Sequence, residues 1–268
     1  MAESNPLKSI SILGCGWFGL AFAKKLVELG YKVKGSTTTQ EKLALLSQEN
    51  INPYLVNFKA NQINAEPDFF DADALFICIP PKRSSIELND YPIKIEAILN
   101  AAKNKAKNVI LISSTSVYGD ENKSVNELSE TYPDTESGKV VLLAEQLFVE
   151  KHPASFTIIR FAGLIGPDRN PGRFFAGKTA VPNGLAPVNL IHQTDAVGIA
   201  TAIIEKQAFG RIYNACASQH PDKKTFYTKA ANDTRLIIPQ FLDEKKSWKI
   251  IESINAPKFL NYVYRIEI

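Results

Sequence analysis

A glycine-rich stretch near the N-terminus constrains the fold of this chain more than any other feature. A short apolar run ends at Leu13, and Gly14, Gly16 and Gly19 follow while the sequence takes on a helical pattern. A strand, a tight turn and a helix in this order bring the backbone close to a pyrophosphate. Gly14 permits the turn, Gly16 lets the backbone approach the phosphate, and Gly19 allows close packing of helix on strand. The stretch therefore predicts a dinucleotide site.

Two aromatic residues, Trp17 and Phe18, follow the second glycine. Both are candidates for contact with the cofactor, and Trp17 would lie against it. Phe18 has an alternative role as a hydrophobic plug between the helix and the sheet.

Strand-like and helix-like runs alternate along the chain with short connections. Ala74–Ile79 is almost continuously apolar, as in a parallel strand covered on both faces, and Pro80-Pro81 ends it. The alternation predicts an α/β fold, a Rossmann-type doubly wound parallel sheet with helices on both faces. The expected strands are Ser9–Leu13, Lys32–Ser36, Pro53–Phe58, Ala74–Ile79, Val109–Ile112, Phe156–Phe161 and Ile212–Ala215, and the expected helices are Trp17–Leu29, Gln40–Gln48, Tyr91–Lys105, Val140–Lys151, Thr194–Glu205 and Lys224–Ala231.

Loop-forming residues become frequent from Gly163 onward, as in the segment Gly166–Gly172. We expect residues 1–268 to form a single NAD(P)-binding domain. Within it, residues of about 166–188 and 218–268 would form a small C-terminal cap over the carboxyl ends of the strands, where ligands of open α/β sheets bind.

Charge and cysteine content narrow the expected partners. Lys and Arg total 31 and Asp and Glu total 28, and the basic residues are scattered, whereas nucleic-acid binding needs a clustered basic face. The three cysteines lie far apart without metal-ligand spacing, so we expect neither a disulfide framework nor a metal site. No segment resembles a signal peptide, and no apolar run approaches about 18 residues. The expectation is a cytoplasmic protein that binds no nucleic acid and no membrane.

The end of the second expected strand bears on the choice of cofactor. A site for NAD usually places a carboxylate there, but this chain has Ser36, Thr37, Thr38 and Thr39. Hydroxyl groups can donate hydrogen bonds to a 2′-phosphate, so NADP is preferred over NAD. The same hydroxyls can also cap the following helix. Further cofactor-binding candidates at strand ends are Ile79, Pro80 and Ser113.

Several motifs together resemble those of the extended short-chain dehydrogenases, the nucleotide-sugar epimerase and dehydratase group. They are the glycine turn, Ser113–Gly119, Arg160–Pro167 and Ile191–Asp195, in this order. The fingerprint Gly-Cys-Gly-Trp-hydrophobic-Gly is that of an atypical branch, and Leu13 stands where the standard fingerprint has its first glycine. The resemblance extends from the first strand to about Phe241. It implies the fold of this group and binding of NAD(P).

In active members of this group, a Tyr and a Lys four residues apart carry the chemistry. Residues at this spacing share a helix face, so the ammonium lowers the pKa of the phenol, which exchanges a proton as hydride moves. In this chain the Tyr position falls on Ser137 and the Lys position on Val141. An aliphatic hydroxyl without a base and a valine cannot do this chemistry. The alignment uses the group's Thr, Gly and Ala-Glu, found here as Thr135, Gly138 and Ala144-Glu145.

Other polar residues of these motifs have both functional and structural interpretations. Ser114 keeps the position of the group's substrate-positioning Ser or Thr. Tyr118 and His192 are interpreted as structural residues. Arg160 and Arg169 are candidates for binding an anionic substrate group, although Arg160 can equally pair with a carboxylate.

Three functions follow as hypotheses. The first is an oxidoreductase or a sugar-nucleotide epimerase/dehydratase-like enzyme that uses NADP and a non-standard active site on an unknown small molecule. The second is a catalytically inactive NADP-binding sensor or regulatory protein, and the third is a non-redox enzyme that reuses the pocket. A homodimer is a further hypothesis, because the apolar run Val140–Leu143 exceeds one buried helix face and family members commonly pair through this helix and the one near Tyr91.

Overall fold

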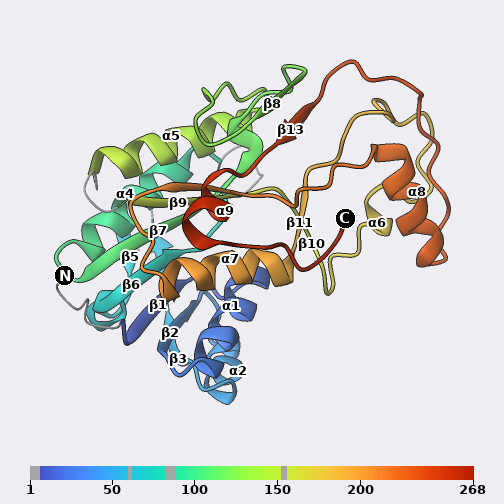
Figure 1. Ribbon diagram of the computed structural model, residues 1–268. Coiled ribbons are helices and arrows are strands. Elements are labelled where there is room, and N and C mark those ends of the chain that lie inside the picture. The colour runs from blue at the N-terminus through green and yellow to red at the C-terminus, as the bar shows by residue number, and fades with distance from the viewer. Residues whose placement is uncertain (1–6, 60–61, 82–87, 152–155) are drawn as a thin grey trace.

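Seven parallel strands form the central sheet, in the spatial order β12-β9-β7-β6-β1-β2-β3 (Figure 1). They belong to a computed structural model that describes residues 7–59, 62–81, 88–151 and 156–268. The order of the strands reverses between β1 and β6, so the carboxyl ends of these two strands border the crevice where such sheets bind ligands. The strands are β1 (Ser9–Leu13), β2 (Lys32–Thr37), β3 (Asn52–Leu55), β6 (Ala72–Ile77), β7 (Ala106–Ser114), β9 (Phe156–Phe161) and β12 (Ile212–Ala215).

Alternate residues of each strand face two different layers of helices. Ile12 and Phe76 lie in one buried cluster with α1, α2 and α7, whereas Leu13 and Ile77 lie in a second cluster with α4 and α5 (Figure 1). Helices therefore cover both faces, and the predicted Rossmann-type doubly wound fold is confirmed. None of the helices in the described residues is long and apolar enough to cross a membrane. The helices are α1 (Trp17–Glu28), α2 (Glu41–Gln48), α4 (Asp90–Ala102), α5 (Glu136–Lys151) and α7 (Gln193–Glu205).

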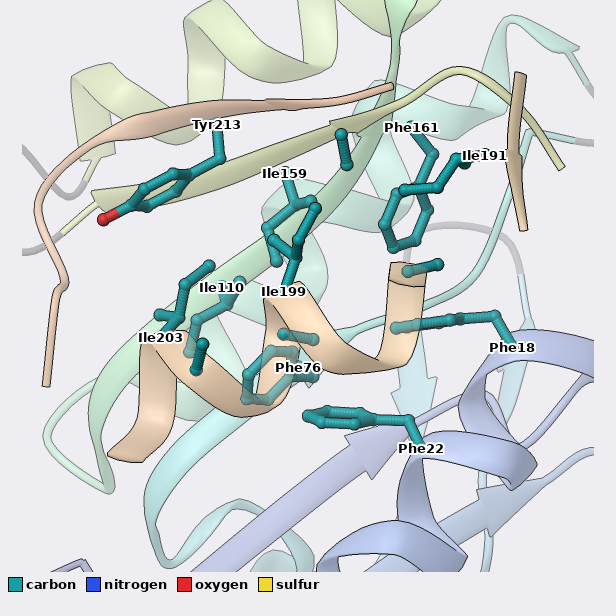
Figure 2. Packing of buried hydrophobic residues seen from close by; sticks show 14 of the residues in the cluster. Phe18, Phe22, Phe76, Ile110, Ile159, Phe161, Ile191, Ile199, Ile203 and Tyr213 are labelled. Atoms are coloured by element: carbon teal, nitrogen blue, oxygen red, sulfur yellow. The ribbon is translucent and has the colours of Figure 1, made fainter. Parts of the chain in front are cut away.

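Aromatic side chains fix α1 against the sheet (Figure 2). The rings of Phe18 and Phe22 stack with their centroids 5.5 Å apart. Phe18 also meets the ring edge of Phe161 at 4.8 Å, and Phe22 meets that of Phe76 at 4.7 Å. Phe18 thus packs as the hydrophobic plug between α1 and the ends of the strands.

The helices α6 (Gly172–Phe175) and α8 (Lys223–Asp233) pack on each other beside the sheet (Figure 1). A smaller apolar cluster joins them to neighbouring segments. Its buried members are Ile165, Val188, Leu190 and Tyr227. The later helix α9 (Asn255–Leu260) instead packs on α7 and β12. Residues 218–268 therefore contribute to both regions, and the division of the chain into one domain with a cap stays a prediction. The remaining short elements are β4 (Asn57–Lys59), β5 (Gln62–Asn64), η1 (Pro67–Phe70), η2 (Thr115–Val117), β8 (Lys123–Val125), β10 (Gly163–Ile165), β11 (Leu190–His192) and β13 (Lys249–Ile251).

Two buried carboxylates, one on α7 and one just after β8, hold the C-terminal segment in place. Asp195 of α7 is 1% exposed and accepts hydrogen bonds from the backbone amides of Arg265 at 2.8 Å and Ile266 at 3.1 Å. Glu127, also buried, accepts the amide of Ile254 at 3.0 Å, just before α9. Backbone amides thus compensate both carboxylates for the loss of water.

Candidate functional site

Gly14 forms the turn after β1 with a backbone conformation that favours glycine. Its φ is +101°, and a Cβ atom there would lie 3.0 Å from Cγ2 of Ile79. The amide of Gly14 donates to Oγ of Ser36 at 2.8 Å, and the amide of Cys15 donates to the Ser36 carbonyl at 2.9 Å. Ser36 is buried, and these two hydrogen bonds to it hold the turn in place.

The first turn of α1 offers space and partial positive charge. Gly16 is the N-cap residue; no side chain caps the helix there, and the first turn contains no acidic residue. A Cβ on Gly16 would meet no atom within 4 Å, whereas one on Gly19 would overlap the carbonyl oxygen of Gly14. Helix amides, the helix dipole and open space at Gly16 together fit the pyrophosphate of a dinucleotide.

Trp17 connects this turn to two later segments. Its indole Nε1 donates to the carbonyl of Pro167 at 2.6 Å, and its own carbonyl accepts from Nε2 of Gln193 at 2.9 Å. The guanidinium of Arg169 lies 4.4 Å from the centroid of the Trp17 ring. This cation–π contact places an exposed positive charge beside the N-terminus of α1.

The threonines at the end of β2 lie outside the cleft described below. Thr37 closes β2, and its hydroxyl accepts from the amide of Thr39 at 3.2 Å. Thr38 and Thr39 are exposed. Their hydroxyls are therefore accessible to a group bound at the carboxyl end of β2.

A cleft of about 860 Å³ extends over the carboxyl ends of β6, β7 and β9 from the first turn of α1 to α8. Nine of the predicted site residues line it, namely Gly16, Trp17, Phe18, Gly19, Ile79, Pro80, Ser113, Ser114 and Ser137, and five do not, namely Gly14, Ser36, Thr37, Thr38 and Thr39. Sequence reasoning missed Lys223, Tyr227 and Lys249, which also line the cleft.

Helix α5 presents Ser137 and Val141 to the cleft. Val141 is 4% exposed and belongs to the main apolar cluster. Ser114 also lines the cleft, and its Oγ accepts the amide of Ser116 at 3.1 Å. Since that bond uses a lone pair, the hydroxyl proton of Ser114 remains available to a ligand oxygen.

Two further titratable side chains of the cleft are protonated at neutral pH. Burial raises the pKa of the Cys78 thiol well above its ordinary value, and burial likewise raises the pKa of the Tyr91 phenol. Burial therefore disfavours the thiolate of Cys78 and the phenolate of Tyr91.

A buried charged pair supports the cleft from behind. Arg160 donates through Nη2 to Glu145 at 2.6 Å and through Nε at 3.0 Å. Its Nη1 donates to the hydroxyl of Tyr118 at 2.6 Å, and Oγ of Ser113 donates to Glu145 at 2.5 Å. Burial raises the pKa of Tyr118 although Arg160 opposes the shift. Arg160 pairs with a carboxylate, one of its two predicted roles, and Tyr118 is a structural residue as predicted.

His192 also has a structural role, as predicted. Its Nδ1 accepts the amide of Thr194 at 3.2 Å and so caps α7. Among the described residues, no group of three or more His, Cys, Asp or Glu side chains is placed to hold a metal ion.

Comparisons with known proteins agree with this architecture. Residues 9–117 match the family described as NADP oxidoreductase, coenzyme F420-dependent. The UDP-glucuronic acid 4-epimerase from Bacillus cereus in complex with NAD has a TM-score of 0.77, covering 97% of this chain and 94% of that chain at 18% identity. The UDP-N-acetylglucosamine 4-epimerase from Bacillus cereus has a TM-score of 0.78, with the same coverage and 17% identity.

The fold and the glycine turn define a Rossmann-type α/β protein, with the same fold as the two epimerases compared above. The alignment of Ser137 and Val141 with the usual Tyr and Lys positions of the extended short-chain dehydrogenases stays a prediction. Protein YeeZ from Escherichia coli (strain K12) is 37% identical to this chain over 266 residues, which are 97% of this chain and 96% of that protein. The chain belongs to the same family as Protein YeeZ.

Proposed function

We propose that the protein binds NADP along the first turn of α1 and acts on a small molecule in the cleft, as an oxidoreductase or epimerase/dehydratase-like enzyme with a non-standard active site. One observation carries the proposal. A single cleft is lined by Gly16 and Gly19 of the glycine turn and by Ser114 and Ser137 of the family's catalytic positions. A nicotinamide cofactor and a ligand would share this space, and the cofactor would supply or accept hydride there.

The preference for NADP over NAD is supported by the end of β2. Residues 36–39 contain no carboxylate that would repel a 2′-phosphate, and Thr38 and Thr39 expose hydroxyl donors. Arg169, held over Trp17, adds positive charge beside the pyrophosphate position at the start of α1.

Ser114 is proposed to hold a substrate oxygen with its free hydroxyl proton. Ser137 lines the same cleft, but Val141, four residues further along α5, supplies no ammonium there. Proton transfer would therefore need a group other than the usual pair.

This replacement of the Tyr–Lys pair also favours a second candidate function. A protein that binds NADP without redox turnover, a sensor or regulatory protein, would keep the glycine turn and lose the proton-transfer pair. The fold does not decide between the two functions.

The cofactor proposal is tested by nucleotide binding. The sequence contains two tryptophans, so Trp248→Phe leaves Trp17 as the single reporter. NADPH should quench Trp17 fluorescence and raise the melting temperature, with about 2.7 kcal/mol of stabilisation at about 100 times Kd. NADH should do so less at equal concentration. No response to either nucleotide would refute the proposal.

The 2′-phosphate site is tested by Thr38→Asp, because a carboxylate at this exposed position repels the phosphate and can accept bonds from ribose hydroxyls. The ratio of NADPH affinity to NADH affinity should fall by about 10-fold or more. Ser47→Asp, which adds the same charge to the exposed far end of α2, should leave the ratio unchanged. An equal effect of both substitutions would show a general charge effect and no 2′-phosphate contact.

Turnover separates the two candidate functions. Oxidation of NADPH by the unmodified protein with a panel of small carbonyl compounds supports the enzyme. Tight NADPH binding without turnover on any of them favours the sensor.

A further inference from the structure

The side of the cleft opposite the glycine turn carries hydrogen-bond donors. Lys223 and Tyr227 lie four residues apart on α8, a spacing that puts them on one helix face, and Lys249 belongs to β13. All three line the cleft, together with Arg169 near the glycine turn. The described residues that line the cleft include no Asp or Glu.

Lys223 is a half-buried cation that has few protein partners to replace the water it loses. In the described part of the chain its ammonium has one hydrogen bond, to the carbonyl of Pro182 at 3.5 Å. Burial lowers the pKa of Lys223, and the charge of Asp120 opposes this shift. Lys223 is also the first residue of α8, where the helix dipole disfavours a cation. Protein contacts therefore leave this charge poorly stabilised.

Tyr227 places a phenol in the same region. Its ring is wedged edge-on against Phe175, with the centroids 4.7 Å apart, and the residue is 8% exposed. No group among the described residues bonds its hydroxyl. Burial raises the pKa of Tyr227 to about 12, so the phenol remains protonated and acts as a donor.

Lys249 has one ammonium proton left for a ligand. Its Nζ donates to the carbonyl of Tyr118 at 2.8 Å and to Oδ1 of Asp120 at 2.7 Å. An ammonium has three N–H donors, so the third is unused by these partners. Asp120 pairs with Lys249, and its charge also acts on Lys223. Two lysines and one carboxylate together keep a net positive charge.

We propose that Lys223, Tyr227 and Lys249 form a subsite for an acidic group, a carboxylate or a phosphate, of the ligand that occupies the cleft. An anion would give Lys223 the partner that it lacks and would accept the free protons of Tyr227 and Lys249. Phe174 and Phe175 line the cleft beside the subsite and fit an apolar body attached to the acidic group. The inference rests on the proposed function, because it names the ligand class of the same cleft.

The test uses three probes that share an aromatic body: benzoate, phenyl phosphate and the neutral benzamide. Binding is measured by titration calorimetry on the full chain, both free and saturated with NADPH. At least one anion should bind about 10-fold or more tightly than benzamide, and the tighter anion identifies the group as carboxylate or phosphate.

Substitutions assign the binding to the subsite. Lys223→Gln should weaken the better anion by about 10-fold and leave benzamide unchanged, and Tyr227→Phe should weaken it by about 3-fold or more. Lys229→Gln removes an exposed lysine from the same helix and should change nothing. The inference is overturned if neither anion binds, if benzamide binds as tightly, or if Lys223→Gln and Lys229→Gln have equal effects.

NADPH binding in the same samples keeps the two proposals separate. If NADPH fails to bind while the anion binds in a Lys223-dependent way, the proposed function fails and the subsite stands. If NADPH binds and the anion does not, the subsite fails and the proposed function stands.

Discussion

Glu145 and Arg160 form a buried ion pair, so the stability of the protein depends on keeping both charges together. Their side chains are 4% and 5% exposed, so both charges are removed from water. The loss of hydration is offset by three hydrogen bonds from Arg160 to the carboxylate and by the further partners Tyr118 and Ser113. A pair of this kind is sensitive to the loss of one member, because the other remains charged and buried.

Arg160→Met should therefore destabilise the protein by about 3–5 kcal/mol, because Glu145 is left without its cation. The double substitution Arg160→Met with Glu145→Leu removes both charges and should recover a large part of that loss. Urea denaturation of both single variants and the double variant gives the coupling energy. Additive losses in the double variant would contradict this account.

Local constraints explain which site residues were predictable from the sequence. Gly14 and Gly19 were identified because a positive φ and a close helix contact admit almost no other residue. The partner of Arg160 was not identified, since the sequence allowed an anionic ligand or any carboxylate. Glu145 becomes its partner only when α5 packs beside β9.

At the scale of elements, α5 decides whether the cleft can transfer protons. The helix begins at Glu136, one turn earlier than its apolar pattern predicts. Thr135 accounts for the early start, because its Oγ1 accepts the amide of Gly138 at 3.0 Å. The first turn is polar and carries no apolar periodicity, so only the family motif, and not the apolar pattern, placed Ser137 on this helix.

Ser137→Tyr combined with Val141→Lys restores the missing pair on the cleft face of α5. Both positions line the cleft, so NADPH binding should be retained, and the ammonium should lower the phenol pKa enough for proton transfer. The expected result is faster NADPH oxidation with at least one carbonyl compound of the panel. The lysine at the buried position 141 should also lower the melting temperature.

The two single variants are the controls, because neither contains a complete pair. If the double variant is folded and binds NADPH but gains no turnover, the pair was not the missing part. Activity in Ser137→Tyr alone would show that another cation already assists the phenol.

Most strands, including the edge strand β12, match the prediction within about three residues at each end, and the clearest difference lies at the opposite edge of the sheet. β6 and β9 follow their apolar runs, within about two residues at each end for β6. The predicted strand Pro53–Phe58 instead divides into β3, which ends at Leu55, and β4, which pairs antiparallel with β5. The last residue of β2, Thr37, pairs with Leu55, the last residue of β3. Beyond Leu55 the chain therefore has no residue of β2 with which to pair.

At the scale of the whole molecule, the ligand side of the cleft was the least predictable part. Lys223 and Lys249 enter the cleft from α8 and β13, far along the chain from Ser114 and Arg169. No local spacing relates these residues, because the path of residues 166–268 over the strand ends brings them together. The sequence motifs therefore predicted the nucleotide side and left the ligand side undefined.

We also propose a homodimer through α4 and α5, which pack side by side (Figure 1). Of the run Val140–Leu143, contacts within the chain bury Val140 and Val141, whereas Leu143 remains 54% exposed. Ile93 of α4 is 40% exposed.

Light scattering after size exclusion should show a dimer, and Leu143→Glu should shift it toward monomer. Leu128→Glu, at an 83% exposed loop position, should not. A monomer at high concentration would contradict the proposal.

The position of β1 inside the sheet has a consequence for the order in which its partners are synthesised. β1 lies between β2 and β6, so the N-terminal strand acquires its second neighbour only when residues 72–77 have been made. β12, at the edge of the sheet opposite β3, is the last strand of the sheet to be synthesised, and the segment 218–268 follows it. A nascent chain on the ribosome would therefore complete its glycine turn and the flanking strands long before α8 exists. The residues of the glycine turn and its flanking strands are thus synthesised well before the ligand side of the cleft, to which α8 and β13 contribute.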